Sequence, residues 1–185
     1  FRSSRPEESK FITAHILKFV LEMYENATYN SRGTIIITES EADSMNALST
    51  MLLIADTFVA LCDEMPLKKV SINIIARAGK NRKTFYYHFE NKDCLITWIF
   101  RYDLGQELKR RFPESTLVYE TGATDSSAQF PFYILQKSGV RSLDHAEFFD
   151  CFAHVLEAKR NFYTQALADT NPYSLRNYLY HLYLP

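Results

Sequence analysis

Hydrophobic residues recur at helical spacing along most of the chain, in blocks separated by polar stretches. Residues 1–30 form the first block, in which Pro6 is followed by two acidic residues, a sequence typical of a first helical turn. The apolar positions of this predicted helix are Phe11, Ile12, Ile16, Phe19, Val20 and Met23. Residues 31–44 are polar and acidic around one β-branched run, a pattern that fits a short strand and a linker equally well.

The segment from Met45 to Pro66 predicts another helix. Its apolar stripe consists of Leu48, Leu52, Ala55, Val59 and Cys62, which are three or four residues apart. Pro66 ends this helix because proline has no backbone N–H with which to continue the hydrogen-bond ladder. Met45 also marks the position where we expect the regular domain organisation to begin.

Two short helices are predicted next, joined by a tight turn at Gly79. The first runs from the capping residue Ser71 to Ala78, and the second is capped by Asn81 and ends near Phe89. Serine and asparagine side chains accept hydrogen bonds from the free amides of a first helical turn. The pattern therefore predicts a helix–turn–helix unit.

A longer helix is predicted to begin after Asn91. The chain then becomes irregular across residues 110–139, where two prolines and two glycines interrupt the pattern. Ser142 is placed to cap a further helix, and helices continue to Tyr183 with an interruption near Pro172. The predicted fold class is all-α.

The composition agrees with a folded, helix-rich protein. Of the 185 residues, 46% are hydrophobic, which argues against intrinsic disorder, and five glycines and six prolines are few for a turn-rich β fold. No uninterrupted apolar run approaches the roughly 18 residues of a membrane span, so we expect no membrane association. Cys62, Cys94 and Cys151 are odd in number and lack C-x-x-C spacing, so we expect ordinary thiols in a reducing cytoplasm.

Positive charge is concentrated in one segment of the chain. Seven basic residues and one acidic residue lie between Lys68 and Lys92, whereas the whole chain has a net charge of −1. The remainder is therefore acidic. Most charge clusters are solvated faces, but a compact basic segment on an acidic protein favours a polyanionic partner at that one place.

The second short helix separates its phenylalanines from its charged residues. Phe85 and Phe89 are four residues apart and are expected to face the core. The residues left for its first turn and outer face are Arg82, Lys83, Thr84, Tyr86, Tyr87 and His88. A helix–turn–helix uses such residues to reach base edges and to hold phosphates. His88 has no Ser, Cys or acidic partner at recognisable spacing, so we expect no enzymatic activity.

One long string crosses this segment: Ala78-Gly79-x-Asn81-x-x-Thr84-Phe85-Tyr86-Tyr87-His88-Phe89-x-Asn91-Lys92-x-x-Leu95. It resembles the DNA-binding domain of TetR-type transcriptional repressors, and the resemblance covers Leu48 to about Tyr102. The looser downstream matches are Trp98-Ile99-Phe100, Lys159-Arg160-Asn161-Phe162-Tyr163 and Ser174-Leu175-x-x-Tyr178-Leu179. These are similar to the dihydroxyacetone-kinase-regulator branch of that family.

The resemblance implies roles for individual residues. Arg82, Lys83 and Thr84 would enter the major groove, with Arg82 placed for a bidentate contact to guanine. The residues that would hold backbone phosphates are Tyr86, Tyr87, His88, Lys92, Ser71 and Asn73. Asn81 and Lys80 complete the predicted DNA-binding set. Lys80 stands where the family usually has a small apolar residue, and its role stays open.

The resemblance also implies a helical body that dimerises and encloses an effector. Aromatic residues are dense there, and most are expected to pack in the core or at the interface. The candidates for effector contacts are Phe148, Phe152, Tyr163 and Tyr178. Metal-ligating residue types also gather there, namely Asp144, His145, Glu147, Asp150, Cys151 and His154. A solvated face with an Asp150–His154 pair one turn apart explains them better, so no metal or other cofactor is expected.

Four regions follow from these patterns. Residues 45–95 are predicted to form the helix–turn–helix domain and residues 96–185 the helical effector and dimerisation domain. TetR-type chains start with the DNA-binding domain, whereas here residues 1–44 precede it. We therefore expect residues 1–30 to supply a last helix of the body, through a rotated order or as the tail of a tandem copy, and residues 31–44 to be a linker or tail.

The sequence thus predicts a cytoplasmic, homodimeric repressor that binds a pseudo-palindromic operator on double-stranded DNA and is released by a small-molecule effector. The alternative is a regulator of the same fold that takes its signal from a protein co-regulator, because the dihydroxyacetone branch includes regulators of that kind. A closed, accessible cavity in the body favours the small ligand. A body of solidly packed aromatic residues favours the protein partner.

Overall fold

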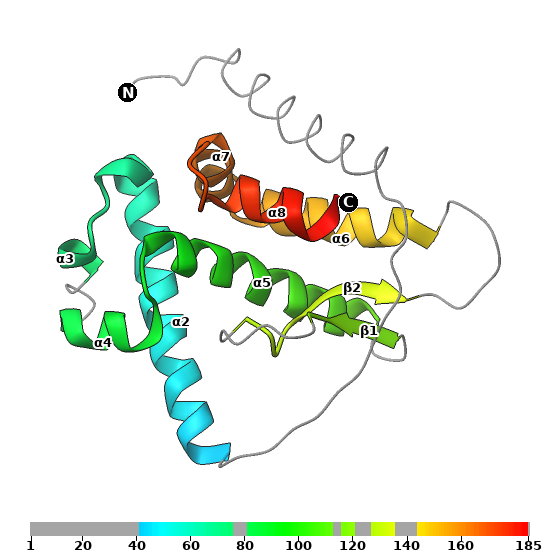
Figure 1. The fold of residues 1–185 in the computed structure, drawn as a ribbon, viewed down its shortest axis with the longest axis horizontal. Coiled ribbons are helices and arrows are strands. Elements are labelled where there is room, and N and C mark those ends of the chain that lie inside the picture. Colours follow the sequence, from blue (N-terminus) through cyan, green and yellow to red (C-terminus); the bar gives the residue numbers. More distant parts are fainter. Residues whose placement is uncertain (1–40, 76–80, 113–115, 121–126, 136–143, 185) are drawn as a thin grey trace.

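A computed structural model describes residues 41–75, 81–112, 116–120, 127–135 and 144–184 of the chain. The elements in chain order are α2 (Glu41–Glu64), a 3-10 helix η1 (Leu67–Lys69), α3 (Ile72–Ile75), α4 (Arg82–His88), α5 (Lys92–Arg111), β1 (Thr116–Tyr119), β2 (Pro131–Leu135), α6 (Asp144–Ala158), α7 (Arg160–Ala168) and α8 (Leu175–Tyr183). The described part is mostly helical, with one small sheet (Figure 1). The helix predicted within residues 1–30 lies outside the described residues.

Helix α5 lies at the centre of the arrangement. In Figure 1, α2, α3 and α4 gather near its N-terminal end, α6, α7 and α8 lie along one side, and the hairpin of β1 and β2 packs near its C-terminal half. The buried residues of α5 are Leu95, Ile96, Trp98, Ile99, Phe100, Arg101, Leu104, Gly105 and Leu108. Because consecutive positions from Trp98 to Arg101 are all buried, neighbouring elements enclose this helix from several directions.

One continuous core connects the two predicted domains. Phe58 of α2 contacts Phe162 of α7 with ring centroids 6.0 Å apart, and Phe100 of α5 contacts Phe152 of α6 at 5.3 Å. The boundary predicted between residues 95 and 96 falls inside α5, which continues across it. The predicted DNA-binding and effector regions therefore share a helix and a core.

Several predicted helix ends are found. Helix α2 ends at Glu64, two residues before Pro66, and Asn91 Oδ1 accepts a hydrogen bond from the Cys94 amide (2.9 Å) to cap α5. Ser174 caps α8 just after Pro172, where an interruption was predicted. The cap predicted at Ser142 lies outside the described residues.

The buried side of α2 differs from the predicted stripe. Ala55 and Cys62 are buried as predicted, but Leu48, Leu52 and Val59 are only partly buried. The other buried positions of this helix are Met51, Ile54 and Phe58. The helix is turned so that its largest apolar side chain, the phenylalanine that meets α7, enters the core. It also begins at Glu41, four residues before Met45.

The hairpin corrects the all-α prediction. Strands β1 and β2 pair antiparallel, with Thr116 opposite Leu135 and Val118 opposite Tyr133. Most residues of the two strands are β-branched or aromatic, which favours strands, whereas the flanking prolines and glycines led us to expect an irregular segment. Gly105 lets the hairpin approach α5, because a Cβ there would lie 2.9 Å from Phe130 Cβ.

The stretch Asn46–Glu64 of α2 is long and apolar enough to cross a membrane by length and composition alone. A mostly buried core helix of a folded domain meets the same criterion, but only 28% of this stretch is buried, including Ile54, Phe58 and Cys62. None of the three cysteines forms a disulfide. Burial raises the pKa of the Cys62 and Cys151 thiols to about 11, so both stay protonated at neutral pH.

We expect Phe58→Ala to destabilise the protein strongly. Phe58 is fully buried and its ring contacts Phe162, so its loss should lower the free energy of unfolding by about 4 kcal/mol. Leu53, which is on the same helix and 43% exposed, is the matched control, and Leu53→Ala should cost less than about 1 kcal/mol. Urea unfolding measures both, and equal losses would contradict the orientation of α2.

Candidate nucleic-acid interface

Helix α4 is held in place by its N-cap and by two phenylalanines. Asn81 Oδ1 accepts hydrogen bonds from the Thr84 amide (2.9 Å) and from Thr84 Oγ1 (3.3 Å). Phe85 and Phe89 are buried with ring centroids 5.7 Å apart, and Phe89 also meets Trp98 of α5 at 5.7 Å. The prediction that both phenylalanines face inward is confirmed, and their packing fixes α4 against α5.

The opposite side of α4 presents cations and phenols to solvent. Arg82 and Lys83 are exposed, Tyr86 is 45% exposed, and Tyr87 is 83% exposed. We call these four residues the cationic face. Their outward orientation confirms the prediction made from helical spacing. A tyrosine as exposed as Tyr87 contributes little to a core, so its ring is free to contact another molecule.

The side chains of Arg82 and Tyr86 contact each other on the surface of α4. Arg82 Nη2 donates a hydrogen bond to the Tyr86 hydroxyl at 3.3 Å, and the guanidinium carbon lies 5.4 Å from the centroid of the Tyr86 ring. The two residues are one helical turn apart, which brings their side chains together. This contact holds the guanidinium beside the helix surface while both residues stay exposed.

Further predicted contact residues flank the cationic face. Ser71, just before α3, and Asn73 in α3 are exposed. Lys68 and Lys69 of η1 belong to the basic segment, were not among the predicted contact residues, and are exposed as well. Figure 1 shows α3 and α4 close together at the same edge of the molecule. Lys80 and the turn at residue 79 lie outside the described residues, so the helix–turn–helix connection itself is not described.

Thr84 and His88 are less available than their neighbours. Thr84 is half-buried, and its hydroxyl is bonded to the capping oxygen of Asn81. His88 is also half-buried, and its ring meets Tyr87 at 4.9 Å between centroids. Both residues border the cationic face, but their described contacts are within the protein.

Lys92 forms a contact within the protein that the sequence did not predict. It is half-buried, and its ammonium donates a hydrogen bond to the backbone oxygen of Leu67 at 3.1 Å. Gln165 of α7 accepts a hydrogen bond from the Leu67 amide at 2.7 Å. Lys92 thus helps to fasten η1 to the start of α5. The two residues are 25 positions apart, so local sequence patterns could not predict this contact.

The four predicted effector residues fall into two groups. Phe148, Phe152 and Tyr163 have 0% exposure and lie in ring contacts within the core. Burial and a hydrogen bond to Asp103 raise the pKa of Tyr163 well above its ordinary value. Tyr178 is only partly buried, and its hydroxyl accepts a hydrogen bond from Arg101 at 2.6 Å.

The Asp150–His154 pair expected on α6 is replaced by a contact with α5. The Asp150 carboxylate pairs with Arg111, whose guanidinium also pairs with Glu107 at 2.6 Å. Hydrogen bonds from Arg110 and, secondarily, from Arg111 hold the pKa of Glu107 down to about 2. His154 is exposed, and among the described residues no group of three His, Cys, Asp or Glu is placed to hold a metal ion.

Sequence reasoning missed Arg101, which is fully buried in α5. It lies three residues after Trp98 and three before Leu104, both of which are buried. An arginine at this position of the apolar stripe could have predicted a buried charge. Its counterion Glu120 follows β1, in a region expected to be irregular. The ion pair between Arg101 and Glu120 could not be predicted from the sequence alone.

A scan against protein-family models and searches of curated proteins and of solved structures give no match for this chain.

Asn81→Ala should lower the free energy of unfolding by about 1 kcal/mol, because the Thr84 amide loses its acceptor. Asn81→Asp is the matched control, since aspartate caps a helix as well as asparagine does, and it should stay within about 0.5 kcal/mol of the parent protein. Urea denaturation measures both variants. An Asp variant as unstable as the Ala variant would contradict the capping role.

Proposed function

We propose that this protein is a DNA-binding transcriptional regulator of the TetR type, with α4 as its recognition helix. The observation that carries the proposal is the cationic face of Arg82, Lys83, Tyr86 and Tyr87, exposed on a helix whose other side is anchored in the core. Such a helix can lie against a duplex without unfolding or repacking.

The lack of carboxylate counterions for Arg82 and Lys83 among the described residues supports the proposal. Within the described part of the chain, neither Arg82 nor Lys83 forms an ion pair with a carboxylate. The arginines of the body that do so are Arg101, Arg110, Arg111 and Arg160. Cations left without internal counterions are available for phosphates, which release bound counterions when they are neutralised.

Each residue of the cationic face has a proposed task. Arg82 reads a guanine edge in the major groove, because its planar fork matches the two acceptors of guanine. Lys83, Tyr86 and Tyr87 hold backbone phosphates, with Ser71 and Asn73 beside them. In a homodimer, two such helices about 34 Å apart would meet successive major grooves of a pseudo-palindromic operator.

Release from DNA is the second part of the proposal. A small effector that prefers a different spacing of the two recognition helices would shift the population away from the DNA-bound form. The dense packing of Phe148, Phe152 and Tyr163 favours the alternative, a protein co-regulator, for that part of the body. The partly buried Tyr178 lies instead at a charged centre, where a small ligand is the better candidate.

Selection of genomic fragments with the purified protein tests DNA binding and supplies an operator. On that operator, Arg82→Ala should weaken binding by about 1–3 kcal/mol and relax the preference at one or two base positions. Fluorescence anisotropy with single-base variants of the site measures the change. Loss of affinity that is equal for every base variant would contradict the base-reading role of Arg82.

Lys83→Ala should weaken binding to all sequences about equally. The slope of log affinity against log salt should become shallower by about one per subunit, because one phosphate contact is lost. Lys109→Ala is the control, since this exposed lysine lies at the opposite end of α5. If both variants change the slope equally, DNA is not held specifically at α4.

A further inference from the structure

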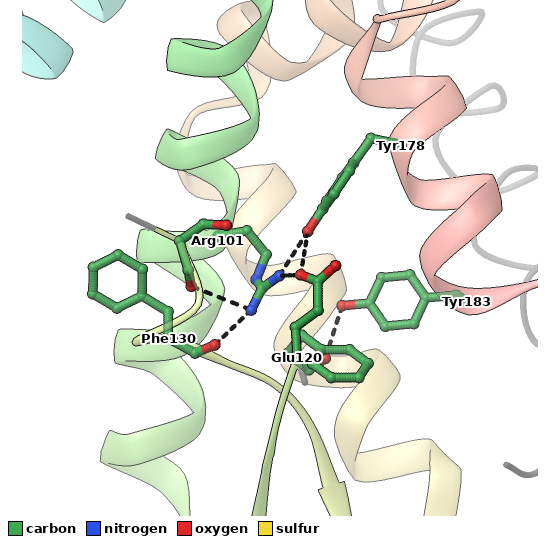
Figure 2. A network of polar contacts seen from close by, with 7 residues as sticks. Arg101, Glu120, Phe130, Tyr178 and Tyr183 are labelled. Atoms are coloured by element: carbon green, nitrogen blue, oxygen red, sulfur yellow. Dashed lines mark hydrogen bonds and ion pairs between the residues drawn. The ribbon is translucent and has the colours of Figure 1, made fainter. Parts of the chain in front are cut away.

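Arg101 forms a buried polar centre between α5, the hairpin and α8 (Figure 2). Its Nη1 pairs with the Glu120 carboxylate and donates a hydrogen bond to the Tyr178 hydroxyl at 2.6 Å. Its Nη2 donates to the backbone oxygens of Phe130 at 2.6 Å and Ser127 at 3.3 Å. We call these five residues the Arg101 centre.

The partners of Arg101 differ in their access to solvent. Phe130 and Ser127 are 3% and 2% exposed and offer backbone oxygens, which cannot leave without moving the chain. Glu120 has a side chain that is 31% exposed, whereas that of Arg101 is 0% exposed. Among the described partners, the carboxylate is thus a side-chain group that reaches from the guanidinium to solvent. Its exchange would keep the bonds from Arg101 to the two backbone oxygens and to Tyr178, while the Tyr178 hydroxyl, which donates to Glu120 at 3.3 Å, would donate to the incoming carboxylate instead.

The hydrogen-bonding capacity of Arg101 is not fully used. Its buried Nε has no hydrogen-bond partner among the residues that the structure describes. A guanidinium offers donors in a planar fork that matches both oxygens of a carboxylate, but here one Glu120 oxygen is paired with Nη1. A buried ion pair adds little net stability over apolar packing, so its presence is better explained by a task other than stability.

The surroundings of the guanidinium are aromatic. The Arg101 guanidinium carbon lies 5.4 Å from the centroid of the Phe132 ring. Tyr183 donates a hydrogen bond to the Phe132 backbone oxygen at 2.8 Å, and Figure 2 shows its side chain next to Glu120. A ligand carboxylate at this position would therefore have aromatic rings beside its apolar part.

We propose that the Arg101 centre is a binding site for a small organic carboxylate with an apolar or aromatic body. In the protein without ligand, Glu120 fills the position of that carboxylate. The ligand displaces Glu120, pairs with Arg101 and packs against Phe132 and Tyr183. The interpretation of this site as the effector site of the regulator rests on the proposed function.

A few contacts along α5 connect the Arg101 centre to the cationic face. Displacement of Glu120 removes an ion pair that fastens the end of β1 to α5. Trp98 lies one turn before Arg101 on the same helix and contacts Phe89, which anchors α4. The carboxylate would thus act on the helix whose first turns support the DNA-binding residues.

Glu120→Ala tests the site directly, with sodium benzoate as the probe and sodium chloride at equal ionic strength as the control. The variant should have a lower Tm than the parent protein, and saturating benzoate should raise that Tm by about 5 °C more than chloride does. Benzoate should have a smaller effect on the parent protein, where it must compete with Glu120. Neutral benzamide should have no effect on the variant.

The double variant Arg101→Met, Glu120→Ala should lose the benzoate response. If Glu120→Ala does not fold, Glu120→Gln allows the same comparison, because its amide fills the space without the charge. Equal shifts with benzoate and chloride, or an unchanged response in the double variant, would overturn the proposal. A benzoate response that needs Arg101, in a protein that binds no DNA, would support the carboxylate site and contradict only the proposed function.

Discussion

The contact between Phe89 and Trp98 determines how α4 is presented. Helix α4 is only seven residues long, too short to be stable without tertiary packing. Its buried phenylalanines and its Asn81 cap supply that packing, and together they fix which side of the helix faces solvent. If this aromatic contact were lost, Arg82, Lys83, Tyr86 and Tyr87 would no longer share one ordered surface, and the proposed interface would not exist.

The same helix that anchors α4 also holds the Arg101 centre. We call the elements from α2 to α4 the head and those from the hairpin to α8 the body. Helix α5 contacts the head through Phe89 at Trp98, and the hairpin and α8 at Arg101 one turn later. Other polar contacts connect head and body, such as Asn161 of α7, which donates a hydrogen bond to the Cys62 backbone oxygen at 3.0 Å. These contacts join the body to η1, α2 and α4, and under the proposed function they are the contacts through which a rearrangement in the body would reach the cationic face.

Sequence patterns correctly predicted those features that depend on interactions between residues close in sequence. The caps Asn81 and Asn91, the end of α2 before Pro66 and the inward orientation of Phe85 and Phe89 all depend on residues within one or two turns. The hairpin, the bond from Lys92 to Leu67 and the pairing of Arg101 with Glu120 depend on contacts distant in sequence, which periodicity does not encode. The rotation of α2 was also missed, because the partner of Phe58 lies in α7.

Hydrogen exchange with and without operator-length DNA tests the central claim most directly, because it reports where the duplex lies on the protein. The account predicts that DNA slows amide exchange in the peptides that contain α3 and α4, including Tyr86 and Tyr87. It predicts no comparable protection in α6 or on the outer side of α8. Unchanged exchange in α4, or protection confined to the body helices, would contradict the proposal that the cationic face binds DNA.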